Sequence, residues 1–308
     1  MSKYGLNNSA KGLISDSWRK DSKKTYDVYL RKWNDYCDKN NVDLMKPTDV
    51  EVANFLSFLF DQNLSYSACK VARAAVASFI VFDYSKNELL RRIMRGVFQR
   101  RPQLTKEVTW DAGQVLRFYK HKFPAKKLSI MDLTIKTVLL LALIMGQRVQ
   151  GLHLINVLNI EIKYGMIKIV YGDLLKTTRP NFHQGEIVIK GYPADKRLCP
   201  VHYVKRYLKV TNKYRKSKSL FLITQKPYGA AAKGTIAKWI RKGLHAAGIN
   251  MKMFSPHSTR AASTSKMKTS KVPLLTIMKT AGWSSAGTFA KFYQKKITSS
   301  GIGMQHLL

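Results

Sequence analysis

Carboxylates are the groups that this chain of 308 residues most clearly lacks. No Asp or Glu occurs from Lys196 to Leu308, a stretch that holds 23 Lys and Arg residues. Metal-dependent nucleases and transposases bind Mg²⁺ through two or three carboxylates. Residues 103–308 contain seven carboxylates, and only Glu107 and Asp111 are close in sequence. Because the seven His residues show no metal-binding spacing either, we expect no metal and no cofactor.

Several other signals are missing. Cys37, Cys69 and Cys199 are far apart and odd in number, which is typical of a reduced, intracellular protein. There is no GxxxxGK[ST] loop for ATP, and the N-terminus has no apolar run that would form a signal peptide. The longest apolar run, Val138–Met145, is too short to span a bilayer and predicts a buried helix.

Positive charge is present in excess. The net charge is +36, with +7 in residues 1–102 and +29 in residues 103–308. This favours nucleic acid as the partner, because neutralised phosphates release their counterions. A membrane would attract the same charge, but no long helix opposes a bulky apolar face to a lysine-rich one. We therefore expect a protein that binds double-stranded DNA, in the nucleus of a eukaryote or the nucleoid of a bacterium.

Hydrophobic periodicity divides the chain into two domains. Residues 1–16 show no regular pattern, and helices are predicted at about 17–39, 48–59, 66–82 and 86–98. Their bundle forms the first domain, residues 1–102, and a charged stretch after it forms a linker. The candidate DNA-binding residues of this domain are Arg91, Arg92, Arg95, Arg100 and Arg101.

The second domain, residues 103–308, combines helices with a small sheet. Helices are predicted at about 111–121, 129–145, 201–210 and 236–244, with three short ones within 254–293 that start near Ser255, Pro273 and Ser285. Runs of β-branched residues at 157–162, 166–171 and 186–189 predict three antiparallel strands, with a turn at Tyr164-Gly165. The predicted fold class is mainly α with a small antiparallel β-sheet (α+β), with a tail from about residue 296.

Without metal or ATP, covalent catalysis by a side chain is the remaining route to phosphodiester cleavage. Arg148 and Arg260 are candidates to hold the phosphate, because a guanidinium binds it bidentately and stays charged. The other candidates are Lys176 as the acid for the leaving 5′-oxygen, His257 as the base, Trp283 as an N–H donor and Tyr293 as the nucleophile. The rival phenols in the same domain are Tyr192, Tyr203, Tyr207, Tyr214 and Tyr228.

Five short motifs occur in one order along the second domain. They are GQRV at Gly146–Val149, Lys176-Thr177, HSTR at His257–Arg260, GWSS at Gly282–Ser285 and Phe292-Tyr293. Together they resemble the tyrosine recombinase, or phage integrase, family over about residues 130–295, and the N-terminal bundle is similar to the family's core-binding domain. The segments HSTRAASTSK and WSS…TFAKFY are most similar to recombinases of DIRS-like and Crypton-type eukaryotic mobile elements.

The resemblance implies a two-domain DNA clamp with its catalytic domain in residues 103–308. It implies site-specific strand cleavage and rejoining through a 3′-phosphotyrosine on Tyr293, with Arg148, Lys176, His257, Arg260 and Trp283 as the other catalytic residues. It also implies a homotetramer on two DNA sites, assembled from a monomer or weak dimer, and a role in the integration or excision of a mobile element.

Two departures from the family pattern leave alternatives open. Family members carry an acidic residue three positions after the first Arg, where this chain has Gly151. The interval from Trp283 to Tyr293 is also slightly longer than in many bacterial members. The alternatives are a domesticated DNA-binding protein with impaired catalysis and a type IB topoisomerase-like nicking-closing enzyme. An RNA-binding protein is a third, although no RRM or KH signature is present.

Overall fold

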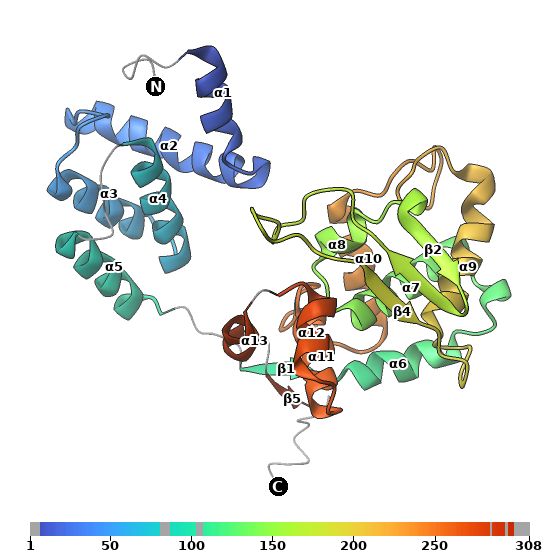
Figure 1. The fold of residues 1–308 in the computed structure, drawn as a ribbon. Coiled ribbons are helices and arrows are strands. Elements are labelled where there is room, and N and C mark those ends of the chain that lie inside the picture. Colours follow the sequence, from blue (N-terminus) through green and yellow to red (C-terminus); the bar gives the residue numbers. More distant parts are fainter. Residues whose placement is uncertain (1–6, 81–86, 103–106, 284, 293–294, 299–308) are drawn as a thin grey trace, which may run out of the picture. The chain divides into compact units, whose positions relative to one another are not determined.

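The computed structural model describes residues 7–80, 87–102, 107–283, 285–292 and 295–298. The chain divides into two compact units, Met1–Thr105 and Lys106–Leu308 (Figure 1). This division lies a few residues after the boundary that we expected at residue 102.

The described part of the first unit consists of helices. They are α1 Asn8–Asp16, α2 Lys20–Asn40, α3 Asp49–Asp61, α4 Tyr66–Phe79 and α5 Glu88–Arg100. The expectation of irregular chain before residue 17 is wrong for α1, because Asn7 accepts the Ala10 N–H and caps the first turn. At α3 the predicted cap is confirmed, since Thr48 and Glu51 form a capping box.

The core of the first unit is built around Trp33 of α2. Its side chain is fully buried and meets Phe55 of α3 edge-on, with ring centroids 5.0 Å apart. Helix α5 closes the bundle by burying Leu90, Met94 and Val97, which follow helical spacing. The opposite face of α5 therefore carries its exposed basic residues, which are Arg91, Arg92, Arg95 and Arg100.

Arg101 departs from the expected DNA-binding set. Its Nη1 donates to the carbonyls of Phe60 at 2.6 Å and Leu64 at 3.1 Å, and its Nη2 donates to Asn63 Oδ1 at 3.1 Å. The guanidinium also lies 3.8 Å from the centre of the Phe60 ring. These contacts stabilise the turn after α3, so Arg101 serves the fold of the unit rather than its exposed basic face.

All the remaining helices and strands of the described residues lie in the second unit. Its helices are α6 Ala112–His121, α7 Ile130–Met145, α8 Val149–His153, α9 Pro200–Thr211, α10 Lys233–Ala246, α11 Ser258–Thr269, α12 Leu274–Ala281 and α13 Ala286–Phe292. Its strands are β1 Val108–Trp110, β2 Ile160–Lys163, β3 Met166–Ile169, β4 Ile187–Lys190 and β5 Lys296–Thr298. Short 3₁₀ helices lie at Ala125–Lys127, Val157–Asn159 and Asn212–Tyr214.

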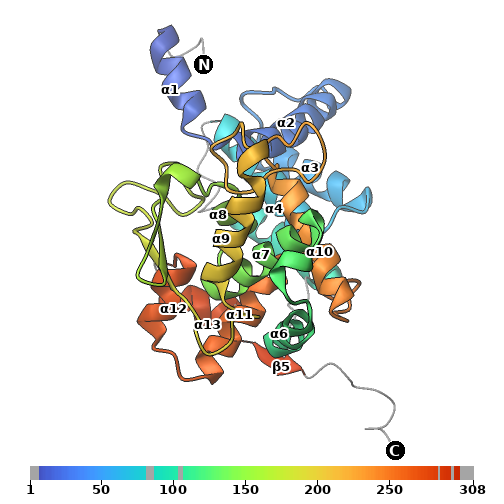
Figure 2. The ribbon, with the colours of Figure 1, turned by 90° about the vertical axis from the view of Figure 1, so that its right-hand side faces the viewer.

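Helix α7 is the centre of the second unit. It contacts α8, α9, α10, α11 and β4 (Figure 2), and 12 of its 16 residues are buried. The prediction of a buried helix in this stretch is confirmed. No helix in the described ranges is long and apolar enough to cross a membrane.

One of the two sheets was predicted from the sequence, and the other was not. Strands β2, β3 and β4 form the predicted antiparallel sheet, with Tyr164 (φ 48°) and Gly165 (φ 72°) at the predicted turn. The second sheet, in which β1 pairs in parallel with β5, was not predicted. The expected tail from about residue 296 starts with strand β5, because Lys296–Thr298 pairs with β1 beside α11 (Figure 1). Residues 299–308 lie outside the described residues.

One buried lysine provides a test of the packing around α7. Lys136 is fully buried, and its Nζ donates to the carbonyls of Tyr119 at 2.6 Å and Lys122 at 2.7 Å, near the end of α6. It lies 4.2 Å from the centre of the Tyr203 ring. Burial lowers the pKa of Lys136 to about 8, with Asp195 acting in the opposite direction.

We predict that Lys136→Met lowers the free energy of unfolding by about 1–3 kcal/mol, because two carbonyls lose a buried donor. Urea denaturation measures the change. The control is Lys126→Met, an exposed site with the same loss of charge, which should change stability by less than about 0.5 kcal/mol. Equal stability of the two variants would contradict the structural role of Lys136.

Candidate active site

Arg148 follows directly from the end of α7. Gly146 ends that helix in the left-handed conformation (φ 56°), as its type and place predict. Two residues later the half-buried Arg148 occupies the N-cap position of α8 with extended backbone. The short connection fixes Arg148 relative to the buried helix α7.

His257 and Arg260 lie at the start of α11. The predicted cap at Ser255 is wrong by about two residues, because Ser255 lies in a preceding turn, where its backbone carbonyl accepts the Ser258 N–H at 2.9 Å and the Ser258 hydroxyl at 2.6 Å. His257 is instead the N-cap residue, with helical backbone, and Arg260 lies in the first turn of the helix. The Arg260 side chain is 1% exposed, whereas that of His257 is exposed.

Arg260 joins the ends of two helices. Its Nη1 donates to the Gly146 carbonyl at 2.9 Å and to the Ala281 carbonyl at 2.7 Å. Its guanidinium carbon lies 4.3 Å from the centre of the Trp283 ring, within the range of a cation–π interaction. Arg260 therefore connects the end of α7, the end of α12 and Trp283.

Lys176 lies in the connection between β3 and β4, and its side chain is exposed. Its backbone N–H donates to Gln150 Oε1 at 3.0 Å. Since Gln150 is in α8, this bond ties the Lys176 connection to the helix that begins at Arg148. Within the described part of the chain, no ion pair links Lys176 or Arg148 to a carboxylate.

The pKa of His257 is affected by several of these residues at once. Desolvation by the surrounding protein is the largest cause that lowers its pKa below the ordinary value of 6.5, although part of the ring reaches solvent. The positive charges of Arg148, Arg260 and Lys176 lower this pKa further, in that order. The structure thus gathers three cations, from three separate segments, whose charges disfavour protonation of one imidazole.

Trp283 closes the other side of this cluster. Gly282 ends α12 in the left-handed conformation (φ 70°), as predicted, and turns the chain into Trp283. The Trp283 side chain is 5% exposed and packs against Phe289 of α13, with ring centroids 5.3 Å apart. Its ring therefore lies between the Arg260 guanidinium and the helix that leads to Phe292.

Tyr293, the candidate nucleophile, lies outside the described residues. The chain is described on both sides of it: Phe292 ends α13, and the Lys295 N–H donates to Ser265 Oγ of α11 at 3.1 Å. Two rival phenols, Tyr203 and Tyr207, are fully buried in α9. Burial, followed by the charge of Asp195, raises the pKa of Tyr203 to about 12, so this phenol is a poor nucleophile.

No role was predicted from the sequence for two glutamines near the cluster. Gln147 Nε2 donates to the Thr280 carbonyl at 2.8 Å, and Gln184 Nε2 donates to the Lys279 carbonyl at 3.0 Å. Gln147 stands next to Arg148 in the GQRV motif, which was a usable signal. Gln184 lies in the long connection before β4, where nothing in the sequence distinguishes it.

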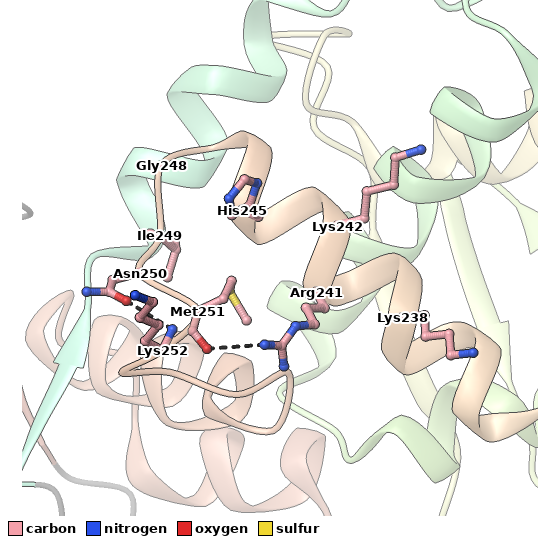
Figure 3. Close-up of a pocket in the computed structure, with 9 residues that line it drawn as sticks. All are labelled: Lys238, Arg241, Lys242, His245, Gly248, Ile249, Asn250, Met251 and Lys252. Atoms are coloured by element: carbon pink, nitrogen blue, oxygen red, sulfur yellow. Dashed lines mark hydrogen bonds between the residues drawn. The ribbon is translucent and has the colours of Figure 1, made fainter.

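A basic groove is separate from this cluster. It has a volume of about 850 Å³ and is lined by Lys238, Arg241, Lys242 and His245 of α10 and by residues 248–252 (Figure 3). Arg241 turns toward the Met251 carbonyl at 3.5 Å, while Lys238 and Lys242 project from the helix (Figure 3). The groove contains none of the candidate catalytic residues, and no carboxylate lines it.

No cluster of three or more His, Cys, Asp or Glu residues that could hold a metal ion occurs in the described ranges. Among the described residues Arg148 and Lys176 form no ion pair with a carboxylate, and they lie on a mainly α unit with a small antiparallel sheet, an arrangement that suits a protein directed to phosphate. The phage integrase family matches residues 111–298, and the chain belongs to this family of tyrosine recombinases. It is accordingly a DNA strand transferase of the recombinase and integrase type.

Solved structures share the fold at low sequence identity. XerH site-specific recombinase, in a post-cleavage complex with a palindromic difH substrate, has a TM-score of 0.62 and 16% identity, covering 88% of this chain and 75% of that chain. A lambda integrase dimer bound to a COC′ core site has a TM-score of 0.57 and 15% identity, covering 96% of each chain. The Tn1549 transposon integrase, in complex with circular intermediate DNA, has a TM-score of 0.54 and 10% identity, covering 86% and 85%. No curated protein matches the sequence significantly.

The effect of the nearby positive charges on the pKa of His257 can be tested by titration of the DNA-free protein. We predict that the pKa of His257 lies below 6.5 and rises in Arg148→Ala, because removal of a nearby positive charge favours the imidazolium. NMR of the histidine ring protons, assigned with His257→Asn, measures both values. The control Lys216→Ala removes an exposed charge that does not act on His257 and should leave the pKa unchanged.

Proposed function

We propose that the chain cleaves and rejoins DNA through a phosphotyrosine formed on Tyr293. One geometric observation carries the proposal: Arg260 Nη1 bridges the carbonyls of Gly146 and Ala281 at 2.9 and 2.7 Å, and the guanidinium lies against Trp283. The positive charges of Arg148, Arg260 and Lys176 also lower the pKa of His257, after desolvation. Cations beside a proton acceptor can balance the negative charge that develops on a phosphodiester during cleavage and can take the proton of the nucleophile. This assigns catalytic roles to Arg148, Lys176, His257, Arg260 and Tyr293, and a positioning role to Trp283.

The proposed reaction has two steps. The Tyr293 oxygen attacks the phosphorus and gives its proton to neutral His257, while the bond to the 5′-oxygen breaks and Lys176 protonates that oxygen. Arg148 and Arg260 balance the added negative charge on the non-bridging oxygens. A 5′-hydroxyl of a partner strand then attacks the phosphotyrosine and gives its proton to Lys176, while the bond from phosphorus to the Tyr293 oxygen breaks and His257 returns the proton to that oxygen. Since the phosphotyrosine conserves the bond energy, neither ATP nor metal is required.

The role proposed for Trp283 differs from simple donation to the phosphate. Its ring faces the Arg260 guanidinium at 4.3 Å and is nearly buried. A stacked ring limits the orientations of a guanidinium. We therefore assign Trp283 the orientation of Arg260, through which it acts on the phosphate.

The proposed partner is double-stranded DNA, bound by a homotetramer on two sites. A lambda integrase tetramer bound to a Holliday junction, which has a TM-score of 0.55 and 15% identity to this chain, supports this assembly. We propose a monomer or weak dimer off DNA. In the first unit, the exposed Arg91, Arg92, Arg95 and Arg100 would bind the DNA backbone.

The proposed biological role is the integration or excision of a mobile element. The Tn1549 transposon integrase, in complex with circular intermediate DNA, supports it by its fold. The HSTRAASTSK and WSS…TFAKFY segments point to the DIRS-like or Crypton-type group. In a eukaryotic host the protein would act in the nucleus, and in a bacterial host in the nucleoid.

Covalent trapping tests the function directly. With a nicked suicide duplex, the wild-type protein should form a protein–DNA adduct that survives excess EDTA, and peptide mapping should place the DNA on Tyr293. Tyr293→Phe removes only the phenolic oxygen, so DNA binding should persist while the adduct disappears. Tyr192→Phe, at a half-exposed rival phenol, is the control that should keep the adduct. DNA attached to any other peptide would overturn the assignment.

A pair of arginine variants separates chemistry from binding. Arg148→Ala should lower the cleavage rate of bound DNA by about 100-fold or more, as expected for loss of a donor to a developing oxyanion, and change affinity by less than about tenfold. Arg241→Ala, in the basic groove, should instead weaken binding and reduce the salt slope of log K by about 1. Single-turnover cleavage and salt-dependent anisotropy measure the two effects. The same outcome for both variants would contradict the separation.

A further inference from the structure

The end of α12 is held by side chains from three other segments. Its last three carbonyls, those of Lys279, Thr280 and Ala281, accept from Gln184 Nε2 at 3.0 Å, Gln147 Nε2 at 2.8 Å and Arg260 Nη1 at 2.7 Å. The final carbonyls of a helix have no partner within the helix, and side chains that donate to them fix the helix end. This arrangement leads directly into Gly282 and Trp283.

The three donors also link α12 to the rest of the candidate active site. Gln147 lies between Gly146, whose carbonyl accepts from Arg260 at 2.9 Å, and Arg148. Gln184 reaches α12 from the connection that carries Lys176. Both glutamine side chains are buried, with 9% of Gln147 and 5% of Gln184 exposed. A shift of either amide would therefore move the groups that surround His257.

Neutral amides suit this place better than carboxylates would. The end of a helix carries a partial negative charge, so a carboxylate beside the Thr280 or Lys279 carbonyl would be repelled and could not donate. A carboxylate would also offset the positive charge of Arg148 and Arg260. An amide donates to the same carbonyls and leaves the charge of the arginines available for a phosphate.

Gly151 makes room for one of these amides. A Cβ atom placed on Gly151 would lie 2.8 Å from Gln147 Oε1 and 3.1 Å from the Tyr171 hydroxyl. That hydroxyl donates to the Gly151 carbonyl at 2.9 Å, so it is held in place. The Gln147 side chain would have to move away from any larger residue at position 151. Gly151 and the position of Gln147 are thus coupled by contact.

We propose that Gln147 and Gln184 are positioning residues of the reaction, which act by holding the end of α12 and, through it, Arg260 and Trp283. The proposal rests on the proposed function. It also assigns a purpose to Gly151, which is to leave the space that Gln147 occupies. Neither glutamine contacts the phosphate in this scheme, because both amides are directed to α12.

The first experiment compares rate and affinity in Gln147→Ala and Gln184→Ala. Each variant should lower the single-turnover cleavage rate of bound DNA by about 10- to 100-fold, the loss expected for a small displacement of catalytic groups. The dissociation constant for DNA should stay within about twofold, because the cations that bind the backbone remain. A role confined to stability would change the melting temperature and leave the rate of the folded, DNA-bound protein unchanged.

The second experiment is a double-mutant cycle with Gly151→Ala. Alone, Gly151→Ala should displace Gln147 and lower the cleavage rate about as much as Gln147→Ala does. In the Gln147→Ala background it should cause no further loss, because the side chain that it displaces is gone. The control is Gly234→Ala in α10, where no atom beyond the neighbouring residues and the backbone of the helix lies within 4 Å of the new methyl group, and no loss is expected.

The outcomes separate this proposal from the function on which it rests. If the wild-type protein forms no covalent adduct with DNA, the proposed function fails. If the wild type forms the adduct and both glutamine variants cleave at its rate, only the positioning role is overturned. Additive losses from Gly151→Ala and Gln147→Ala would overturn the coupling between these two positions.

Discussion

The arrangement of the site depends on one buried guanidinium, that of Arg260. Its Nη1 bridges the carbonyls of Gly146 and Ala281, which end α7 and α12. Burying a charge is costly unless polar groups surround it, and the negative ends of two helices offset that cost here. The two hydrogen bonds also limit how far Arg148 and Trp283 can lie from Arg260. Arg148 follows Gly146 by two residues and Trp283 follows Ala281 by two, so one contact relates segments that are far apart in sequence.

The same geometry explains how a site of like charges is kept together. Arg148, Arg260 and Lys176 repel one another, and their positive charges add to desolvation in lowering the pKa of His257. Lys176 and Arg260 contact neutral groups, which are an amide side chain for Lys176 and backbone carbonyls and an aromatic ring for Arg260. A site built in this way keeps its positive charge for a ligand, whereas one built on carboxylate pairs would be partly neutralised before the ligand arrives.

Local features of the fold could be predicted from the sequence, and long-range ones could not. The left-handed ends at Gly146 and Gly282, the cap at Thr48 and the turn at Tyr164-Gly165 follow from a few neighbouring residues. Strands β1 and β5 have three residues each and are recognisable only through their pairing across most of the second unit. Arg101 and Gln184 are similar cases, because their roles depend on carbonyls in other segments. For the active site, the order of motifs identified the cations, but not the amides that hold them.

Gly151 replaces the acidic residue of the family pattern, and its surroundings in the structure change how this difference is interpreted. In the sequence, glycine in place of an acidic residue counts against catalysis, because a supporting group is missing. In the structure the space beside Gly151 is filled by Gln147 and by the Tyr171 hydroxyl, and Gln147 donates to α12. The position therefore lacks a negative charge but not a structural support. Since Arg148 has no carboxylate partner within the described residues, an acid at this position would reduce the positive charge that a phosphate encounters. The substitution thus weighs less against an active enzyme than the sequence alone suggested.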